Sequence, residues 1–167
     1  FKFSNKNSGV LGTDTLNLQA YSPSTDYSVD AACSYSSGNN LSTLTEKQTL
    51  TTVYLWSYNK LHVIAEIANT TYAQVTTALG YTDAQMATLE SSANPDVAAI
   101  RQKLNQAYKG TAAQVTTYTW APITGITSKT DPNGNVTHYN YDSFGRLQSV
   151  TDNEGKTVQA YEYNYKN

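Results

Sequence analysis

A turn motif that occurs twice in the last third of the chain constrains the fold of this 167-residue protein more than any other feature. Residues 131–134 read Asp-Pro-Asn-Gly, and residues 152–155 read Asp-Asn-Glu-Gly. An Asp side chain can accept hydrogen bonds from the backbone amides ahead of it, and Gly supplies the positive φ that a chain reversal needs. The four positions Asp131, Gly134, Asp152 and Gly155 therefore predict two tight turns, and the chain between them predicts consecutive β-hairpins.

Pairs of tyrosines accompany these turns. Tyr139 and Tyr141 form the first pair, and Tyr161 and Tyr163 form the second. This period-2 spacing puts both rings of a pair on one face of a strand, and Tyr is favoured on a half-buried sheet surface. Residues 141–147, Tyr-Asp-Ser-Phe-Gly-Arg-Leu, predict a strand end, a tight turn and the start of the next strand.

This stretch resembles the YD repeat of the bacterial RHS family, whose consensus is approximately Tyr-Asp-x-x-Gly-Arg-Leu followed by Asp-x-x-Gly. The resemblance covers about the last third of the chain. It implies a hairpin array from the C-terminal part of a secreted or cell-surface bacterial protein. In this family long arrays wind into hollow shells, some of which enclose a toxin domain. The residues that match in order and spacing are Tyr141, Asp142, Gly145, Arg146, Leu147, Asp152 and Gly155.

Self-comparison extends the repeat upstream in a weaker form. One alignment of the chain on itself places Tyr35 on Tyr141, and a second places Trp56 on Tyr139. A third alignment places Tyr118 on Tyr139 as well, so Trp56 and Tyr118 are equivalent in the repeat although they lie far apart in the sequence. Because neighbouring units are spaced much more closely than this, roughly forty residues are inserted between two β-units.

The inserted residues, about 71–110, have apolar side chains at helical spacing, which predicts three short helices. Their end signals are Gly80 as the C-cap of a helix over 72–79, a capping box from Thr82 to Gln85, and Asn94 as an N-cap ahead of Pro95 at the first helical position.

The rest of the chain alternates polar and apolar residues, which predicts strands. We therefore expect a mainly β (α+β) fold, in which sequential YD-repeat hairpins form an antiparallel sheet with a small three-helix insert, in a single domain over 1–167. The expected strands are 15–21, 27–35, 41–45, 49–58, 63–67, 116–120, 125–130, 136–141, 146–151 and 157–165.

Composition excludes several classes of protein. Charged residues make up 14% of the chain and the net charge is −2, so no basic field exists for nucleic acid or for anionic membranes. No apolar run is long enough to span a membrane. With one cysteine, and with His62 and His138 on different units, no metal site is expected. The acids Asp83, Glu90 and Asp96 are expected at helix starts or on solvated faces. We expect no cofactor and no catalytic residues, because no catalytic motif is present.

The aromatic series allows two interpretations. The rings can stack on sugars or contact a peptide, or they can pack across strands and hold adjacent hairpins together. The second interpretation is favoured, because the aromatic residues recur with the repeat itself. The candidate ligand contacts are Tyr54, Trp56, Tyr58, Trp120, Tyr139, Tyr141, Tyr161 and Tyr163.

The expected function is a non-enzymatic structural or binding module of a secreted or cell-surface RHS protein. Its expected partners are the remainder of the parent chain and a glycan or a surface protein. One alternative is part of a toxin-encapsulating shell with a processing role at Asp131, which precedes a proline as in a family cleavage motif. A more distant alternative is a glycan hydrolase, which would need a pair of carboxylates facing each other in a cleft.

Overall fold

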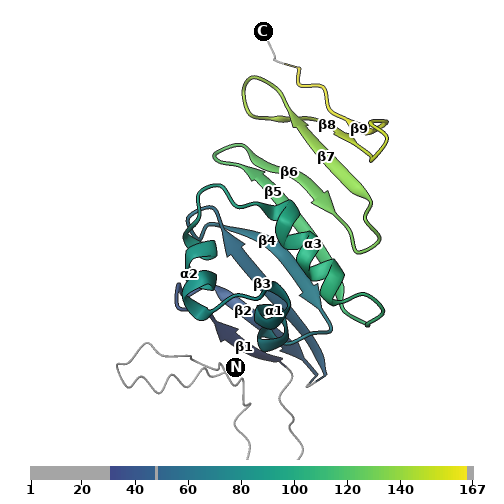
Figure 1. Ribbon diagram of the computed structural model, residues 1–167. Coiled ribbons are helices and arrows are strands. Elements are labelled where there is room, and N and C mark those ends of the chain that lie inside the picture. Colours follow the sequence, from purple (N-terminus) through teal and green to yellow (C-terminus); the bar gives the residue numbers. More distant parts are fainter. Residues whose placement is uncertain (1–30, 48, 165–167) are drawn as a thin grey trace, which may run out of the picture.

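The computed structural model describes residues 31–47 and 49–164, and in this part of the chain nine strands form a single antiparallel sheet (Figure 1). Each strand pairs with its neighbours in sequence, so the sheet is a simple meander. The mainly β fold with helices is confirmed, whereas the expected strand 15–21 and residues 27–30 lie outside the described residues. The strands are β1 (Ala31–Tyr35), β2 (Leu41–Glu46), β3 (Leu50–Ser57), β4 (His62–Ala68), β5 (Gln114–Ala121), β6 (Gly125–Thr130), β7 (Val136–Tyr141), β8 (Leu147–Thr151) and β9 (Thr157–Ala160).

Three helices follow β4 and precede β5: α1 (Tyr72–Leu79), α2 (Asp83–Ser91) and α3 (Val97–Ala107). They lie over one face of the N-terminal part of the sheet, and β6–β9 extend beyond them (Figure 1). The hydrophobic core lies between these helices and strands β3–β5, because short helices persist only when an apolar stripe is packed. Its fully buried side chains include Val53, Ile64, Ile67, Val75 and Leu104.

Two of the three helix signals are confirmed. Gly80 is the C-cap of α1 with a φ of 67°, and Thr82 and Gln85 form the capping box of α2. The assignment of Asn94 as the N-cap of α3 is wrong. Asp96 is the N-cap, and its carboxylate accepts a hydrogen bond of 2.9 Å from the amide of Ala99. This bond satisfies one of the free amides in the first turn, so the helix begins at Val97, after Asp96.

Three expected strands are longer than the observed ones. The smallest difference is in β8, which begins at Leu147 and not at residue 146. β3 ends at Ser57, because Tyr58 and the two residues after it all have positive φ and turn the chain. Tyr58 therefore does not continue the alternation of Tyr54 and Trp56. β9 ends at Ala160, although the amide of Tyr161 still donates to Gln148 O at 2.9 Å. Tyr165, the last residue of the expected strand, lies outside the described residues.

Candidate functional site: the aromatic joints between hairpins

Three turns in the C-terminal half share one hydrogen-bond pattern. They span residues 131–135, 142–146 and 152–156, and each begins with Asp and has Gly in fourth place. The amide of each Gly donates to the carbonyl of its Asp at 2.9–3.0 Å, and the amide of the fifth residue donates to the Asp carboxylate at 2.9–3.0 Å. The Gly residues have φ of 92°, 75° and 79°. Asp131, Gly134, Asp142, Gly145, Asp152 and Gly155 thus occupy equivalent places in three reversals of one kind.

The middle turn has an additional ion pair. Arg146 Nη2 lies 2.7 Å from Asp142 Oδ2, and Arg146 Nε donates to the same oxygen at 2.8 Å. These bonds, together with those from the backbone amides of the turn, hold the pKa of Asp142 below its ordinary value. The first turn lacks such a pair, and there the bond from the Asn135 side chain is the main cause of the lowered pKa of Asp131.

A fourth turn of the same form joins β1 to β2 at residues 36–40, where the sequence predicts a turn between the expected strands 27–35 and 41–45. The amide of Ser36 donates to Asn40 O at 2.8 Å, and the amide of Asn39 donates to Ser36 O at 2.9 Å. Ser36 Oγ replaces the Asp carboxylate, and Asn39, at a φ of 62°, replaces the Gly. Ser and Asn are the usual substitutes at these two places, because a Ser hydroxyl can accept from turn amides and Asn tolerates positive φ.

A side-chain hydrogen bond links each hairpin to the one before it. The polar atom of an aromatic side chain donates to a backbone carbonyl in the last strand of the preceding hairpin. We call each such donor and acceptor an aromatic joint. The bonds satisfy a polar atom that would otherwise need water, while the ring packs across two strands. The four joints are Trp56 Nε1 to Leu41 O at 2.7 Å, Trp120 Nε1 to Val63 O at 2.8 Å, Tyr141 Oη to Ile126 O at 2.8 Å, and Tyr163 Oη to Leu147 O at 2.8 Å.

The strand pairing shifts beside three of these donors, as in a β-bulge. The shifts lie at Trp56, Trp120 and Tyr141, and a similar one lies at Tyr35 in β1. Each of these residues therefore holds the same place in its hairpin. All three helices lie between Trp56 and Trp120 in the sequence, whereas Trp120 and Tyr141 follow each other in adjacent hairpins. The helices are thus inserted between β4 and β5 without breaking a joint.

The geometry corrects the sequence alignment at one point. Trp56 is equivalent to Trp120, not to Tyr118 as the alignment of Trp56 on Tyr139 indicated. That alignment also superposed Ile64 on Leu147, and it followed an apolar pattern that in β4 is set by the covering helices rather than by the repeat. The other upstream alignment, which placed Tyr35 on Tyr141, agrees with the position of the bulges.

The residue just before each acceptor lies against the donor side chain in three of the joints. The guanidinium of Arg146 is 4.4 Å from the centroid of the Tyr163 ring, as in a cation–π contact. The His62 ring stacks on Trp120 with centroids 4.4 Å apart. In the Tyr141 joint this place is Gly125, where a Cβ atom would come within 2.8 Å of the tyrosine hydroxyl oxygen. Neither the Arg146 contact nor the His62 stack was predicted from the sequence.

Three of the remaining candidates, Tyr54, Tyr139 and Tyr161, belong to a second series two residues before each joint donor, and Tyr118 completes it. Tyr54, Tyr118 and Tyr139 are half-buried, whereas Tyr161 is 38% exposed. Burial and the bond from Tyr118 Oη to Glu66 Oε2, at 3.0 Å, raise the pKa of Tyr118, and burial also raises the pKa of Tyr54. Contact of any of these rings with a ligand stays a prediction. Tyr58 lies apart from the series, and its hydroxyl accepts from the amide of Trp120.

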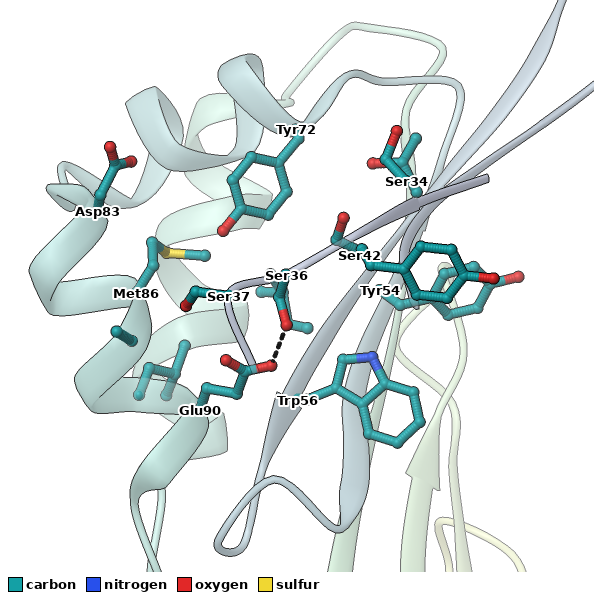
Figure 2. A pocket seen from close by; sticks show the side chains of 15 residues that line it. Ser34, Ser36, Ser37, Ser42, Tyr54, Trp56, Tyr72, Asp83, Met86 and Glu90 are labelled. Carbon is teal, nitrogen blue, oxygen red and sulfur yellow. Dashed lines mark hydrogen bonds between the residues drawn. The ribbon is translucent and has the colours of Figure 1, made fainter. Parts of the chain in front are cut away.

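A cavity of about 470 Å³ lies between strands β1–β3 and helices α1 and α2 (Figure 2). Glu90 points into this region from α2 and accepts hydrogen bonds from Ser36 Oγ and from Asn40 Nδ2, the latter at 3.3 Å. Glu90 is only 6% exposed, so its expected place on a solvated face is wrong. It fixes the β1–β2 turn against α2, and burial together with the negative charge of Glu90 raises the pKa of Tyr72.

Arg101 connects α3 to the hairpins beyond the helices. Its guanidinium donates to the carbonyls of Val115, Thr130 and Asp131, and to the Thr117 hydroxyl. Burial lowers the pKa of this guanidinium, while Asp131 opposes that shift. No sequence pattern pointed to this role.

The family model described as RHS Repeat matches residues 124–164, which run from the end of the β5–β6 loop to a point beyond β9. The chain carries an RHS repeat. The resemblance drawn from residues 141–155 is confirmed, and the matched RHS stretch contains all three Asp–Gly turns and the joints of Tyr141 and Tyr163. No curated protein matches the chain.

Two further observations bear on the site. Within 31–47 and 49–164, no helix is long and apolar enough to cross a membrane. Over the same residues, no three His, Cys, Asp or Glu side chains gather in a group that could hold a metal ion.

Proposed function

We propose that this chain is a non-enzymatic structural module of an RHS/YD-repeat protein, in which each hairpin is one unit and the aromatic joint links it to the next. The observation that carries the proposal is the recurrence of one bond at four places along the sheet, two of them upstream of the matched repeat. Reuse of one contact at nearest-neighbour interfaces is how repeat proteins gain stability.

Each residue of the YD motif has a role in this scheme. Tyr141 is the joint donor, Asp142 accepts from the turn amides, and Gly145 provides the positive φ. Arg146 pairs with Asp142 and lies against the ring of the next unit, and the carbonyl of Leu147 accepts the next joint bond. The motif thus specifies both a hairpin and its connection to the following hairpin. The β3–β4 and β5–β6 hairpins are diverged units that keep the joint and change the turn, whereas the β1–β2 hairpin keeps a turn of the same form.

RHS proteins are typically extracellular or at the cell surface, and we place this chain in that setting. Its main partner is then the remainder of the parent repeat array, which continues the sheet by strand pairing. A glycan or a surface protein is the expected external ligand, and the second aromatic series offers the rings for it. The bonds from the backbone and side chain of Asn135 to Asp131 support a turn role for that aspartate rather than a processing role.

Two experiments on the purified chain test this proposal. A glycan array and a pull-down with surface extracts are done with wild type, Tyr54→Ala and Tyr139→Ala. A ligand face requires binding that both substitutions reduce at least tenfold while the chain stays folded by circular dichroism. Turnover of any bound glycan by the wild-type chain would contradict the non-enzymatic assignment.

A further inference from the structure

Three successive hairpin tips along one rim of the sheet each expose a large apolar side chain. In a meander all connections from an odd to an even strand leave the sheet at the same edge, here at β3–β4, β5–β6 and β7–β8 (Figure 1). The tips present Leu61 at 68% exposure, Ile123 at 106% and Phe144 at 77%. Single exposed apolar residues are ordinary, but recurrence at three tips along one rim requires an explanation.

The opposite rim provides the contrast. The turns at 131–135 and 152–156 have Asn133 and Glu154 in the place where the 142–146 turn has Phe144. An exposed Leu50 also lies near this opposite rim, but it belongs to a strand and not to a turn tip. The apolar tips are therefore a property of one rim and not of hairpin turns in general.

Turn chemistry does not account for Ile123. Its φ is 74°, a left-handed conformation that β-branched residues rarely adopt and that Gly or Asn would take with less strain. Its side chain is fully exposed, so no packing against residues 31–47 or 49–164 compensates for the strain. A residue that is unfavourable for the turn and unpacked in the monomer is best explained by a contact outside the chain.

We propose that this rim binds the lipid–water interface of a membrane, with Leu61, Ile123 and Phe144 inserted among the acyl chains. Successive tips are two strands apart, about 10 Å, with polar backbone between them. A rigid protein partner would need three separate matched pockets, whereas a fluid interface accepts side chains at any spacing. Interfacial binding grows with the buried apolar area and does not require a spanning segment.

The charges at the tips fit this surface. Exposed Lys60 precedes Leu61 and supplies a cation beside that tip. Beside Phe144 the guanidinium of Arg146 is paired with Asp142, so this tip carries no net charge that would oppose burial in the interface. The carboxylate of Asp142 is paired with Arg146 and so does not oppose approach to phosphate groups. On the β1–β2 turn of the same rim the tip is polar and lies against Glu90, which limits the contact to three tips.

Vesicle sedimentation with the full chain tests the proposal, using phosphatidylcholine vesicles and vesicles that also contain phosphatidylglycerol. We expect wild type to bind both, because the apolar tips rather than net charge make the contact. Replacing any one of the three apolar tip residues by Ser should lower the coefficient for partition onto vesicles by about tenfold. Ile123→Asn separates binding from folding, because it should raise the melting temperature while it weakens vesicle binding. Asn133→Ser and Glu154→Ser, on the opposite rim, should leave binding unchanged.

Insertion itself is measured by quenching with brominated lipids. Phe144→Trp should show strong quenching, and Asn133→Trp, the matched control, should show no more than the background from Trp56 and Trp120. The proposal is overturned if wild type binds neither vesicle, or if only the anionic vesicle binds and tip substitutions have no effect. It is also overturned if the substitutions change the oligomeric state by light scattering and leave vesicle binding unchanged, which would indicate a protein partner. None of these results bears on the aromatic joints, so the proposed scaffold role is tested separately.

Discussion

The hairpin under the helices and the hairpins beyond them share one backbone plan but bury very different side chains. At the bulge beside each joint donor, three residues lie together on one face. In β3–β4 these residues are apolar and buried beneath the helices. In β5–β6 and β7–β8 they carry hydroxyl and amide groups that bond to one another. Examples are the bond between the hydroxyls of Thr119 and Ser128 at 2.6 Å and the bond from Asn140 to Ser149 at 3.2 Å. The three sets are Leu55, Ile64 and Ala65; Thr119, Thr127 and Ser128; and Asn140, Gln148 and Ser149.

This difference separates two sources of stability. The bulge and the joint recur in both regions, so they specify the hairpin. The helices add a hydrophobic core to one region only. A hairpin pair is marginal without an apolar face or covering element, which makes the joint more important where no helix lies over the sheet.

The largest expected effect comes from truncating equivalent positions in the two regions. Leu55→Ala removes a side chain that is 2% exposed and should cost about 2–5 kcal/mol. Thr119→Ala, at the same place in the uncovered hairpin, should cost no more than about 1 kcal/mol, because it removes only hydroxyl hydrogen bonds. Urea unfolding of both variants measures the difference. Equal costs would show that the helices do not distinguish the two regions.

The next largest effect concerns the connection between the regions. Arg101→Met keeps much of the length of the side chain but removes its bonds to the carbonyls of Val115, Thr130 and Asp131, and should cost about 2 kcal/mol. Hydrogen exchange should accelerate in β6 and β7 more than in β3. Gln102→Met, at an exposed neighbouring position on α3, is the control and should change neither quantity.

Removing one joint bond should have a smaller effect that depends on the region. Tyr141→Phe leaves the ring in place but deletes the bond to Ile126 O, at a cost of about 1 kcal/mol. Tyr139→Phe, two residues earlier in the same strand, is the matched control for loss of a hydroxyl. Hydrogen exchange of the β7–β8 amides should increase for the first variant and stay near wild type for the second. Equal hydrogen exchange in the two variants would show that the joint bond does not stabilise the hairpin.

The smallest effect is a pH dependence in the uncovered region. The bond from Arg146 lowers the pKa of Asp142 below the ordinary value of 3.8, so the unfolded chain holds this proton more tightly than the folded chain. The stability from the ionised carboxylate is then fully present above about pH 4 and is lost as the pH falls through the folded pKa. When the melting temperature of β7–β9 is plotted against pH, Asp142→Asn should reduce its fall at acid pH. An equally steep fall in the variant would show that other carboxylates cause the loss of stability at acid pH.

Sequence reasoning succeeded where local chemistry decides the structure. The Asp–Gly turns, the Gly80 cap and the Thr82–Gln85 capping box depend on residues within a few positions of one another, and each was predicted at its position. It also found the helical insert, because an interrupted repeat leaves the interruption visible as a change of spacing.

It failed where a distant partner or a competing local preference decides. Glu90 and Arg101 act on turns far from them in the sequence, and no spacing rule encodes those contacts. Trp56 was made equivalent to Tyr118 instead of Trp120, because the apolar residues of β4 follow the helices and not the repeat. Asp96 and not Asn94 caps α3, because the carboxylate two residues later accepts from the amide of Ala99.

The indole N–H groups of Trp56 and Trp120 allow the most direct test of the central claim, that one aromatic bond joins the hairpins in both the covered and the uncovered regions. The chain has only two tryptophans, so its NMR spectrum has two indole resonances that Trp56→Phe and Trp120→Phe assign. Both indole protons donate to carbonyls at 2.7–2.8 Å, and we expect both to exchange with solvent far more slowly than free indole. Exchange of either proton at the rate of free indole would contradict the joint and the repeat scheme built on it.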